Sequence, residues 1–213
     1  KTKAKKVLGI DASTNSVAFC LMDNNVPQKW GKIEFTGASI YDKIYDAKVK
    51  VHAILDELKA DYIAVEGAVL VRSPDAVIKL SYVYGVVIAE LMSTGAKVIT
   101  ISPTAWQAHI GNKNPTKVEK EALRVKHPGY ADSWYKNKMR EIRKQRTVDY
   151  FNNKYSLNLK DFDVADSFGI GRLLVCGFLS DGLLAGVLPF VFGPSQDFVD
   201  DGIHGGEIGR AHV

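Results

Sequence analysis

The sequence predicts an α/β protein in which a mixed β-sheet carries helices on its faces. Short apolar runs of strand length alternate with helical stretches, and two strand-like runs flank the turn residues Asp23-Asn24-Asn25, which is typical of a hairpin. The expected order is strand, hairpin, helix, strand, helix, strand and then helices, as in mixed sheets. The chain has 213 residues, of which 46% are hydrophobic and 24% charged, and this composition excludes a collagen-like, coiled-coil or wholly disordered chain.

Five runs are expected to form the strands of this sheet. Each is short, and each ends at turn residues or at an acid. The five runs are residues 7–10, 16–22, 29–35, 62–65 and 97–101.

Six stretches are expected to be helices. Residues 41–59 repeat apolar side chains at helical spacing, and residues 76–92 form a largely apolar helix after Pro74. Two later helices are rich in basic residues and are separated by the breaker His127-Pro128-Gly129. These two are residues 115–126 and 133–153, and the other two helices are residues 104–110 and 162–179.

The chain length suits one domain with a sizeable core. We expect that domain to cover residues 1–180, with a basic helical insert at about 112–146. Residues 181–213 are expected to be a C-terminal extension, because the stretch from residue 193 is rich in glycine and shows little periodicity. The extension is expected to be loosely packed or derived from an expression vector, with an ordered acidic extension as the alternative.

The net charge of +4 hides a strong asymmetry along the chain. Residues 113–160 carry 13 Lys/Arg and 5 Asp/Glu, whereas residues 161–213 carry 2 Lys/Arg and 8 Asp/Glu. A basic middle third beside an acidic end predicts a surface for a polyanion next to a carboxylate-rich site. The alternative is an ordinary solvated helix face.

The number of cysteines and the hydropathy of the chain indicate the cellular compartment in which the protein is expected. Cys20 and Cys176 are the only cysteines, which is too few for a disulfide framework and favours a reducing interior. The most apolar stretch, residues 173–192, is interrupted by Asp181, glycines and Pro189, so we expect no membrane partner. A cytoplasmic protein, bacterial or in the cytoplasm of a phage-infected host, is the expectation.

Two acids follow strands that read as buried. Asp11 comes directly after Val-Leu-Gly-Ile, and Glu66 comes directly after Tyr-Ile-Ala-Val. A buried carboxylate is costly unless a cation or hydrogen-bond donors compensate it. Because ligands bind at the carboxyl ends of strands in open α/β sheets, we expect Asp11 and Glu66 to converge on one crevice.

A further group of acids opens the last helix, in the stretch Asp161-Phe-Asp163-Val-Ala-Asp166. Asp163 and Asp166 are three residues apart and therefore share a helix face. Capping explains Asp161 well and Asp166 poorly, because Asp166 lies deeper and is flanked by apolar residues. A cluster of oxygen ligands without His or Cys suits Mg²⁺ or Mn²⁺, and beside a basic surface it predicts metal-assisted attack on a phosphodiester.

These motifs together resemble the RuvC family of Holliday-junction resolvases, within the RNase H-like and retroviral-integrase superfamily. Three stretches carry the resemblance, in the same order and at similar spacing: Gly9-Ile10-Asp11-Ala12-Ser13-Thr14, Ala64-Val65-Glu66 and Asp163-Val-Ala-Asp166-Ser-Phe-Gly-Ile-Gly. The resemblance covers about residues 6–180. It implies an RNase H-like five-stranded sheet and a divergent or phage-type member of the family.

The resemblance implies a structure-selective endonuclease that cleaves Holliday junctions and other branched DNA by two-metal-ion hydrolysis. Asp11, Glu66, Asp163 and Asp166 would hold two Mg²⁺ ions per active site, with Mn²⁺ able to substitute. Family members act as homodimers that make paired, symmetric nicks. The outward face of the helix expected at 76–92 is our candidate for the dimer contact, with a buried core helix as the alternative.

The resemblance also implies basic residues just before the last helix. By position, Lys144 is the best match and is predicted to be catalytic. We expect the DNA to contact a set of cations in and around the insert, namely Lys113, Lys138, Arg140, Arg143, Lys144 and Arg146. Where bacterial members use an aromatic at the junction, this chain has Val69-Leu70.

Other interpretations stay open on the residues alone. An actin-like ATPase or sugar kinase also has a Gly-Ile-Asp loop followed by hydroxyl residues, although it needs a second domain and a second phosphate motif. A non-catalytic DNA-binding scaffold of the same fold, or a branched-DNA or RNA nuclease, would also fit. Trp106 is expected to be a packing residue, whereas packing and base stacking are about equally favoured for Trp134.

Overall fold

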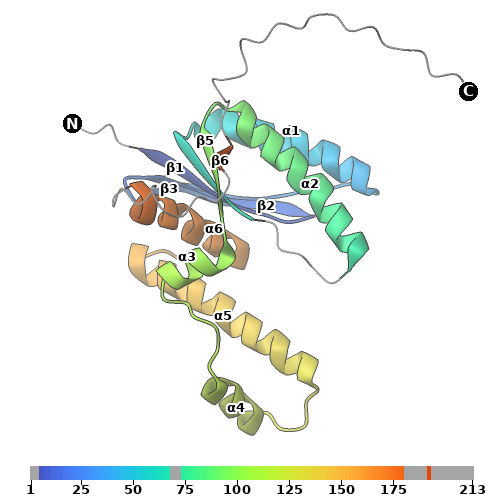
Figure 1. The fold of residues 1–213 in the computed structure, drawn as a ribbon, viewed down its shortest axis with the longest axis vertical. Coiled ribbons are helices and arrows are strands. Elements are labelled where there is room, and N and C mark those ends of the chain that lie inside the picture. The colour runs from blue at the N-terminus through green and yellow to red at the C-terminus, as the bar shows by residue number, and fades with distance from the viewer. Residues whose placement is uncertain (1–4, 68–72, 180–190, 193–213) are drawn as a thin grey trace, which may run out of the picture.

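A computed structural model describes residues 5–67, 73–179 and 191–192 of the chain. In these residues one mixed sheet runs in the order β3-β2-β1-β4-β5-β6, with helices on both faces (Figure 1). The predicted α/β class and the five expected strands are confirmed. Residues 69 and 70, singled out in the sequence, lie outside the described part.

The antiparallel half of the sheet is a meander of β1 (Lys6–Ala12), β2 (Ser16–Asp23) and β3 (Val26–Glu34). Asn24 and Asn25 connect β2 to β3, with φ angles of 47° and 65°. Two consecutive residues with positive φ define the turn whose twist matches a two-residue hairpin, and asparagine tolerates that conformation. The expected hairpin is therefore present with its expected turn residues.

The parallel half places β4 (Tyr62–Glu66) beside β1 and β5 (Lys97–Ile101) beside β4. A two-residue strand, β6 (Val191–Phe192), pairs antiparallel with β5 at the edge. β6 lies in the range 181–213 that the sequence predicts to be a loosely packed extension, and this short part of it adds to the sheet. The other residues of that range lie outside the described part.

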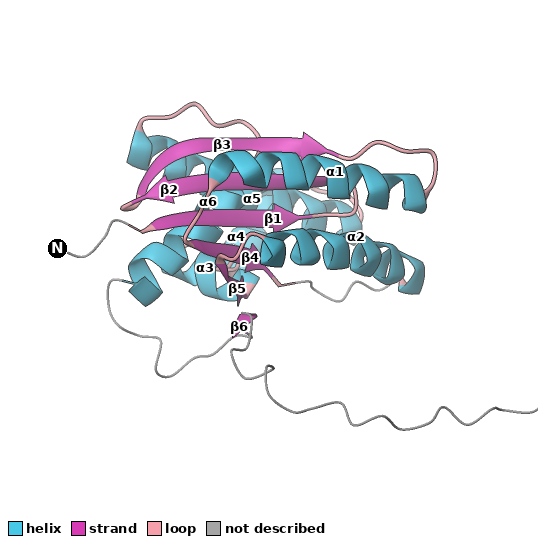
Figure 2. Cartoon of the chain, turned by 90° about the horizontal axis from the view of Figure 1, so that it is seen from above, coloured by secondary structure: helices cyan, strands magenta, loops and turns pink. Residues whose placement is uncertain are grey.

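Two helices cover one face of the sheet, α1 (Ile40–Leu58) and α2 (Pro74–Ser93) (Figure 2). A capping box between Ser39 and Asp42 begins α1, and Pro74 begins α2. By length and composition alone, α2 would suffice to cross a membrane, a test that core helices of soluble proteins also pass. In the structure α2 packs on α1, and its three buried residues are Val83, Val87 and Leu91.

The other face carries α3 (Pro103–His109), α5 (Asp132–Tyr155) and α6 (Phe162–Leu173), and α6 continues into the π-helical segment η1 (Leu174–Leu179). Trp106, Phe151 and Phe168 are fully buried between these helices and the sheet. The long basic helix α5 and the short helix α4 (Lys117–Lys126) form a helical hairpin whose tip extends away from the sheet (Figure 1).

The α4–α5 hairpin, residues 117–155, contains most of the stretch 112–146 that the sequence predicts to be a basic helical insert. Leu123 of α4 is buried, and Glu119 closes a capping box with Thr116 at the start of that helix. The Glu119 carboxylate also accepts a hydrogen bond from Arg146, which joins α4 to α5. At the base of the hairpin, the buried Asn112 donates to the Arg143 carbonyl and to Thr147 Oγ1, both at 2.9 Å.

Candidate active site

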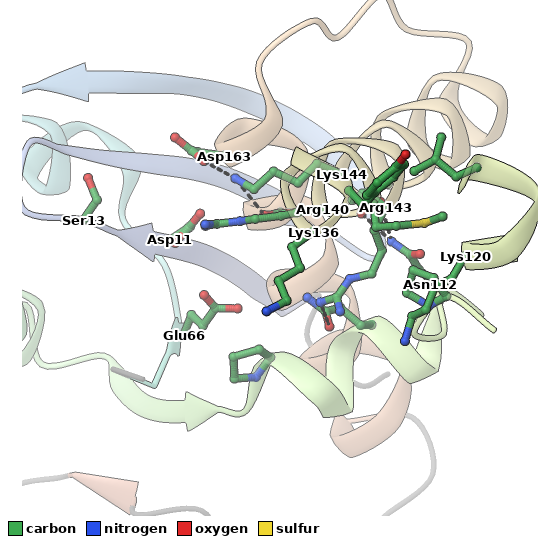
Figure 3. Close-up of a pocket in the computed structure, with 18 of the residues that line it drawn as sticks. Asp11, Ser13, Glu66, Asn112, Lys120, Lys136, Arg140, Arg143, Lys144 and Asp163 are labelled. Carbon is green, nitrogen blue, oxygen red and sulfur yellow. Dashed lines mark hydrogen bonds and ion pairs between the residues drawn. The ribbon is translucent and has the colours of Figure 1, made fainter. Parts of the chain in front are cut away.

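The register of the two parallel strands brings Asp11 and Glu66 together. Ile10 lies opposite Val65 in the ladder between β1 and β4, so the next residue on each strand is an acid. Both acids therefore emerge at the same edge of the sheet, where parallel strands end and ligands bind in such folds. The predicted convergence of Asp11 and Glu66 on one crevice is the observed arrangement (Figure 3).

Glycines let α6 approach β1 closely enough to place its acids at the same edge. A Cβ atom added to Gly9 would lie 2.1 Å from the Ser167 carbonyl oxygen and 2.6 Å from the Gly171 backbone nitrogen. A side chain at residue 9 would therefore push α6 off the strand. Asp161 caps α6 by accepting from the backbone nitrogens of Asp163 and Val164, as the capping interpretation of Asp161 predicts.

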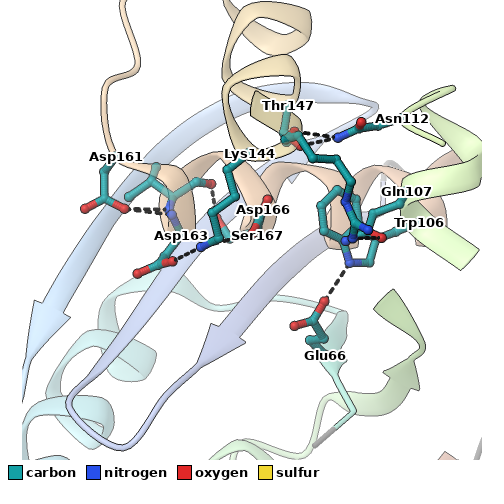
Figure 4. Close-up of polar contacts among 12 residues, drawn as sticks. Glu66, Trp106, Gln107, Asn112, Lys144, Thr147, Asp161, Asp163, Asp166 and Ser167 are labelled. Carbon is teal, nitrogen blue, oxygen red and sulfur yellow. Dashed lines mark hydrogen bonds and ion pairs between the residues drawn. The ribbon is translucent and has the colours of Figure 1, made fainter. Parts of the chain in front are cut away.

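Three of the four predicted acids form a cluster of metal-binding size. Carboxylate oxygens of Asp11, Asp163 and Asp166 lie within 4.8 Å of one another. Glu66 lines the same cleft but is outside this cluster, and its Oε1 instead accepts a hydrogen bond from Trp106 Nε1 at 2.7 Å (Figure 4). The four acids therefore divide into a close group of three and one neighbour.

The electrostatics of the cluster favour a cation. Burial, followed by repulsion from Glu66, Asp166 and Asp163, raises the pKa of Asp11 to about 8. Burial also raises the pKa of Asp166 to about 7, although Lys144 opposes the shift. Carboxyl groups so arranged repel one another when ionised, and a divalent ion with oxygen ligands relieves that repulsion. The donor set and its crowding thus fit Mg²⁺ or Mn²⁺.

Two lysines hold Asp163. Lys144 Nζ lies 2.8 Å from one of its oxygens, and Lys32 Nζ lies 2.7 Å from the other. Burial alone would raise the pKa of Asp163, but these two hydrogen bonds outweigh burial and lower it. Lys144 Nζ is also 3.7 Å from Asp166, so the predicted lysine does lie at the acids. Lys32 comes from β3 and was not predicted from the sequence, because its stretch shows no motif.

Glu66 occupies a separate environment built around Trp106. Trp106 is 1% exposed, as expected of a packing residue, and a Cβ atom added to Gly169 would lie 2.3 Å from its indole ring. The small residue on α6 therefore makes room for an indole that reaches Glu66. Burial raises the pKa of Glu66, while the Trp106 hydrogen bond opposes that shift. The contact between Trp106 and Glu66 was not predicted from the sequence.

A cleft of about 720 Å³ leads from the acids along α5 toward α4. Its acidic end holds Asp11, Glu66, Asp163 and Asp166, and the rest of its lining is rich in cations from the α4–α5 hairpin (Figure 3). The cations that line it are Lys120, Arg124, Lys136, Arg140, Arg143 and Lys144. The predicted polyanion-binding surface and the carboxylate site are thus two ends of one cleft.

The predicted DNA-contact residues fall into two groups. Arg140, Arg143 and Lys144 line the cleft. Lys113, Lys138 and Arg146 do not, and the last two pair with Glu141 and Glu119. Lys120, Arg124 and Lys136 line the cleft but were not singled out, although their basic character and helical spacing were visible in the sequence.

Comparison with known proteins shows which solved structures share this fold. No protein-family model and no curated protein sequence matches the chain. The structure is similar to RuvC of Thermus thermophilus in complex with a Holliday junction substrate, with a TM-score of 0.58 and 12% identity over 87% of this chain and 99% of that one. A second structure of Thermus thermophilus RuvC matches with a TM-score of 0.54 and 12% identity, covering 78% and 91% of the two chains. The fold is therefore that of RuvC, as the sequence motifs predict.

The yeast mitochondrial Holliday junction resolvase Ydc2 is also similar. Its TM-score is 0.48 and its identity 15%, with 80% of this chain and 78% of that chain covered.

Proposed function

We propose that this protein is a divalent-metal-dependent endonuclease that cleaves Holliday junctions and other branched DNA. The observation that carries the proposal is the cluster of Asp11, Asp163 and Asp166 oxygens within 4.8 Å, at the end of a cation-lined cleft. Carboxylates that bind hard cations, beside a surface that attracts phosphates, are the parts that metal-assisted phosphodiester hydrolysis requires. The RuvC fold, seen in complex with a Holliday junction in Thermus thermophilus, supports the substrate class.

The acids have distinct roles in this proposal. Asp11, Asp163 and Asp166 would hold one Mg²⁺ ion, and Glu66 in the same cleft would help to hold a second. A bound divalent ion lowers the pKa of an attacking water and stabilises charge on the phosphate and the leaving oxygen. Trp106 fixes one Glu66 oxygen by its hydrogen bond and so restrains the orientation of the carboxylate. Mn²⁺ is expected to replace Mg²⁺ because it accepts the same oxygen ligands.

Lys144 contributes positive charge between the acids and the rest of the cleft. It contacts Asp163 and Asp166 while lining the cleft, so a phosphate that reaches the acids also meets this ammonium group. Its own pKa is raised, because the hydrogen bond to Asp163 and the nearby acids outweigh burial, and the group therefore stays protonated. Lys32 restrains Asp163 from the opposite side.

Symmetric cleavage requires two such sites, and α2 offers a surface for a second copy of the chain. Residues on its outward face, at helical spacing, are exposed and uncharged: Ile78, Tyr82, Ala89 and Met92. α2 lies on the sheet face opposite the α4–α5 hairpin, so a contact there leaves both clefts open (Figure 1). An isologous dimer through α2 would present two equivalent sites to a two-fold symmetric junction.

The proposal is tested by nicking of a four-way junction labelled on each strand in turn. We expect paired, symmetric cuts with Mg²⁺ or Mn²⁺, none in EDTA, and little cutting of linear duplex. Asp11→Asn should abolish cleavage while junction binding persists, and exposed Asp56→Asn is the matched control. Junction binding without metal-dependent cleavage would contradict a nuclease and favour a scaffold. ATP turnover without cleavage would favour a kinase or ATPase.

A further inference from the structure

The tip of the α4–α5 hairpin carries an aromatic stack that the metal site does not use. The rings of Tyr130 and Trp134 lie 4.2 Å apart at their centroids, with an interplanar angle of 19°. His127 lies against the same indole at 5.4 Å. This group belongs to the basic insert, and no residue of it contacts the acids directly.

Side chains of the hairpin interior hold the stack in place. Tyr135 packs edge-on against Trp134 at 5.2 Å, and its hydroxyl donates to the His127 carbonyl. The Arg124 guanidinium lies over the Tyr135 ring at 4.6 Å and pairs with Asp132 at 2.7 Å. These contacts join both ends of the connection between α4 and α5. Contacts that do not involve Tyr130 therefore join the two helices at the tip.

Tyr130 lies on the outside of this arrangement and is 54% exposed. Because Trp134 covers one face of its ring, the exposed area belongs to the other face and the ring edge. An exposed aromatic face that adds little to the packing beneath it is available to a planar partner. Buried Tyr135, at 7% exposure, already closes the apolar interior of the hairpin.

The position of the stack relative to the acids suggests what that partner is. Trp134 and Lys144 are both on α5, and their separation of ten residues corresponds to about 15 Å at a rise of 1.5 Å per residue. The cleft reaches Asp132 and Tyr135, on either side of Trp134 in the chain, with Lys136 and Arg140 between them and Lys144, and the stack itself lies just outside its lining. A spacing of about 15 Å corresponds to roughly four base steps of B-form DNA. Aromatic faces combined with a cationic groove are the usual means of holding unpaired nucleotides.

We propose that Tyr130, stacked on Trp134, is a platform for an unpaired base of a DNA strand that leaves the acids along the cleft and passes the hairpin tip. The inference rests on the proposed function, because it assumes a nucleic-acid strand in the cleft. It adds a second contact point at the hairpin tip, one that recognises unpaired bases at the centre or end of a branched substrate. Stacking is tolerant of sequence, so the platform recognises structure without selecting a base.

The test measures binding of the full chain in EDTA, so that no cleavage intervenes. The probes are a duplex with a short single-stranded gap containing 2-aminopurine, and a fully paired duplex of the same length. Tyr130→Leu should weaken binding to the gapped duplex about tenfold, within the range that base–aromatic stacking supplies. It should also remove the quenching of 2-aminopurine fluorescence. Tyr130→Phe, which keeps the ring, should bind and quench like the parent.

Two controls separate stacking from charge and from folding. Tyr130→Leu should leave the paired duplex and the salt dependence of binding unchanged, because stacking releases no counterions. Lys126→Ala, an exposed cation at the same tip, should weaken binding to both duplexes. Thermal unfolding of Tyr130→Leu should match that of the parent, given the exposure of the side chain.

Equal loss of affinity for both duplexes, or no loss for either, would overturn the platform. The outcome is separable from that of the proposed function. Normal junction cleavage together with unchanged binding of gapped DNA by Tyr130→Leu would reject the platform alone. Ring-dependent binding by a protein that cleaves no DNA would reject the nuclease alone.

Discussion

Trp106 donates its indole hydrogen to Glu66 across 2.7 Å, and the two residues come from different elements, α3 and the end of β4. The hydrogen bond favours the ionised carboxylate, whereas burial favours the neutral acid and raises the pKa of Glu66. The indole therefore opposes the effect of burial and favours the ionised form of Glu66, which is the form that the proposed metal site requires.

Trp106→Phe should raise the pKa of Glu66 further and move metal-dependent cleavage to higher pH. A hydrogen bond to a charged group contributes roughly 1.5 kcal/mol, so the acid limb of the pH–rate profile should shift up by about one unit. The measurement is the rate of junction nicking against pH at saturating Mg²⁺. Trp30→Phe on β3, which is 37% exposed, is the matched control. An unmoved acid limb in Trp106→Phe would show that the hydrogen bond does not tune Glu66.

Asp11 gives a prediction for stability in the absence of metal. Its pKa is raised from 3.8 to about 8, so the unfolded chain loses this proton at lower pH than the folded protein does. The associated stability is fully present below about pH 4 and is lost progressively as the pH rises to about 8.

Asp11→Asn removes that titration and should be more stable than the parent in EDTA at pH 8, by on the order of 1 kcal/mol or more. The advantage should shrink toward pH 4. Added Mg²⁺ should raise the melting temperature of the parent and not that of Asp11→Asn. Asp56→Asn, at an exposed carboxylate, should behave like the parent throughout. A parent protein that is insensitive to Mg²⁺ would contradict the assigned metal site.

The cations of the insert should differ in their effect on DNA binding. Lys136 and Arg140 line the cleft, and neither forms an ion pair with any residue that the structure describes. Each is expected to neutralise about one phosphate, so Lys136→Ala with Arg140→Ala should reduce the log–log salt slope by roughly 1.8 on duplex DNA. Lys138 and Arg146 are engaged by Glu141 and Glu119, and the pair of Ala variants at these positions should change the slope less. Equal slopes for the two double variants would mean that the cleft does not select the contacts.

The four acids and Lys144 differ in how well the sequence alone predicts them. Asp11 and Glu66 were predictable because each directly follows a buried parallel strand, and such strand ends share one edge of a sheet. The helical spacing of Asp163 and Asp166 placed them on one face. Lys144 was found only through the resemblance to RuvC, since nothing in its own stretch distinguishes it from neighbouring cations.

The missed contacts depend on distances between elements far apart in the chain. Trp106 reaches Glu66 because Gly169, on another helix, leaves room for the indole. Lys32 reaches Asp163 from β3, which is separated from β1 by β2, and no local pattern encodes that reach. The edge pairing of Val191 with Ile99 likewise depends on the path of a segment whose composition suggested a loose extension.

The exposed face of α2 gives the last prediction. Ile78 and Tyr82 are 51% and 48% exposed on a helix whose buried residues Val83, Val87 and Leu91 face inward. The outward face of α2 therefore carries an exposed apolar stripe. A buried core helix, the alternative for this segment, would not expose these side chains. Exposed apolar patches of this kind mark protein interaction sites.

Ile78→Glu with Tyr82→Glu should turn the proposed dimer into a monomer, because two carboxylates in an isologous contact meet their own copies across the two-fold axis. Light scattering at micromolar concentration should give about twice 23.5 kDa for the parent and about half of that value for the double variant. The variant should still bind a junction and nick single strands, while the paired cuts become uncoupled. Val26→Glu, an equally exposed apolar position on β3, should remain dimeric. A double variant that keeps the parent mass and its paired cuts would place the contact elsewhere, since no dimer through α2 tolerates four new charges at its centre.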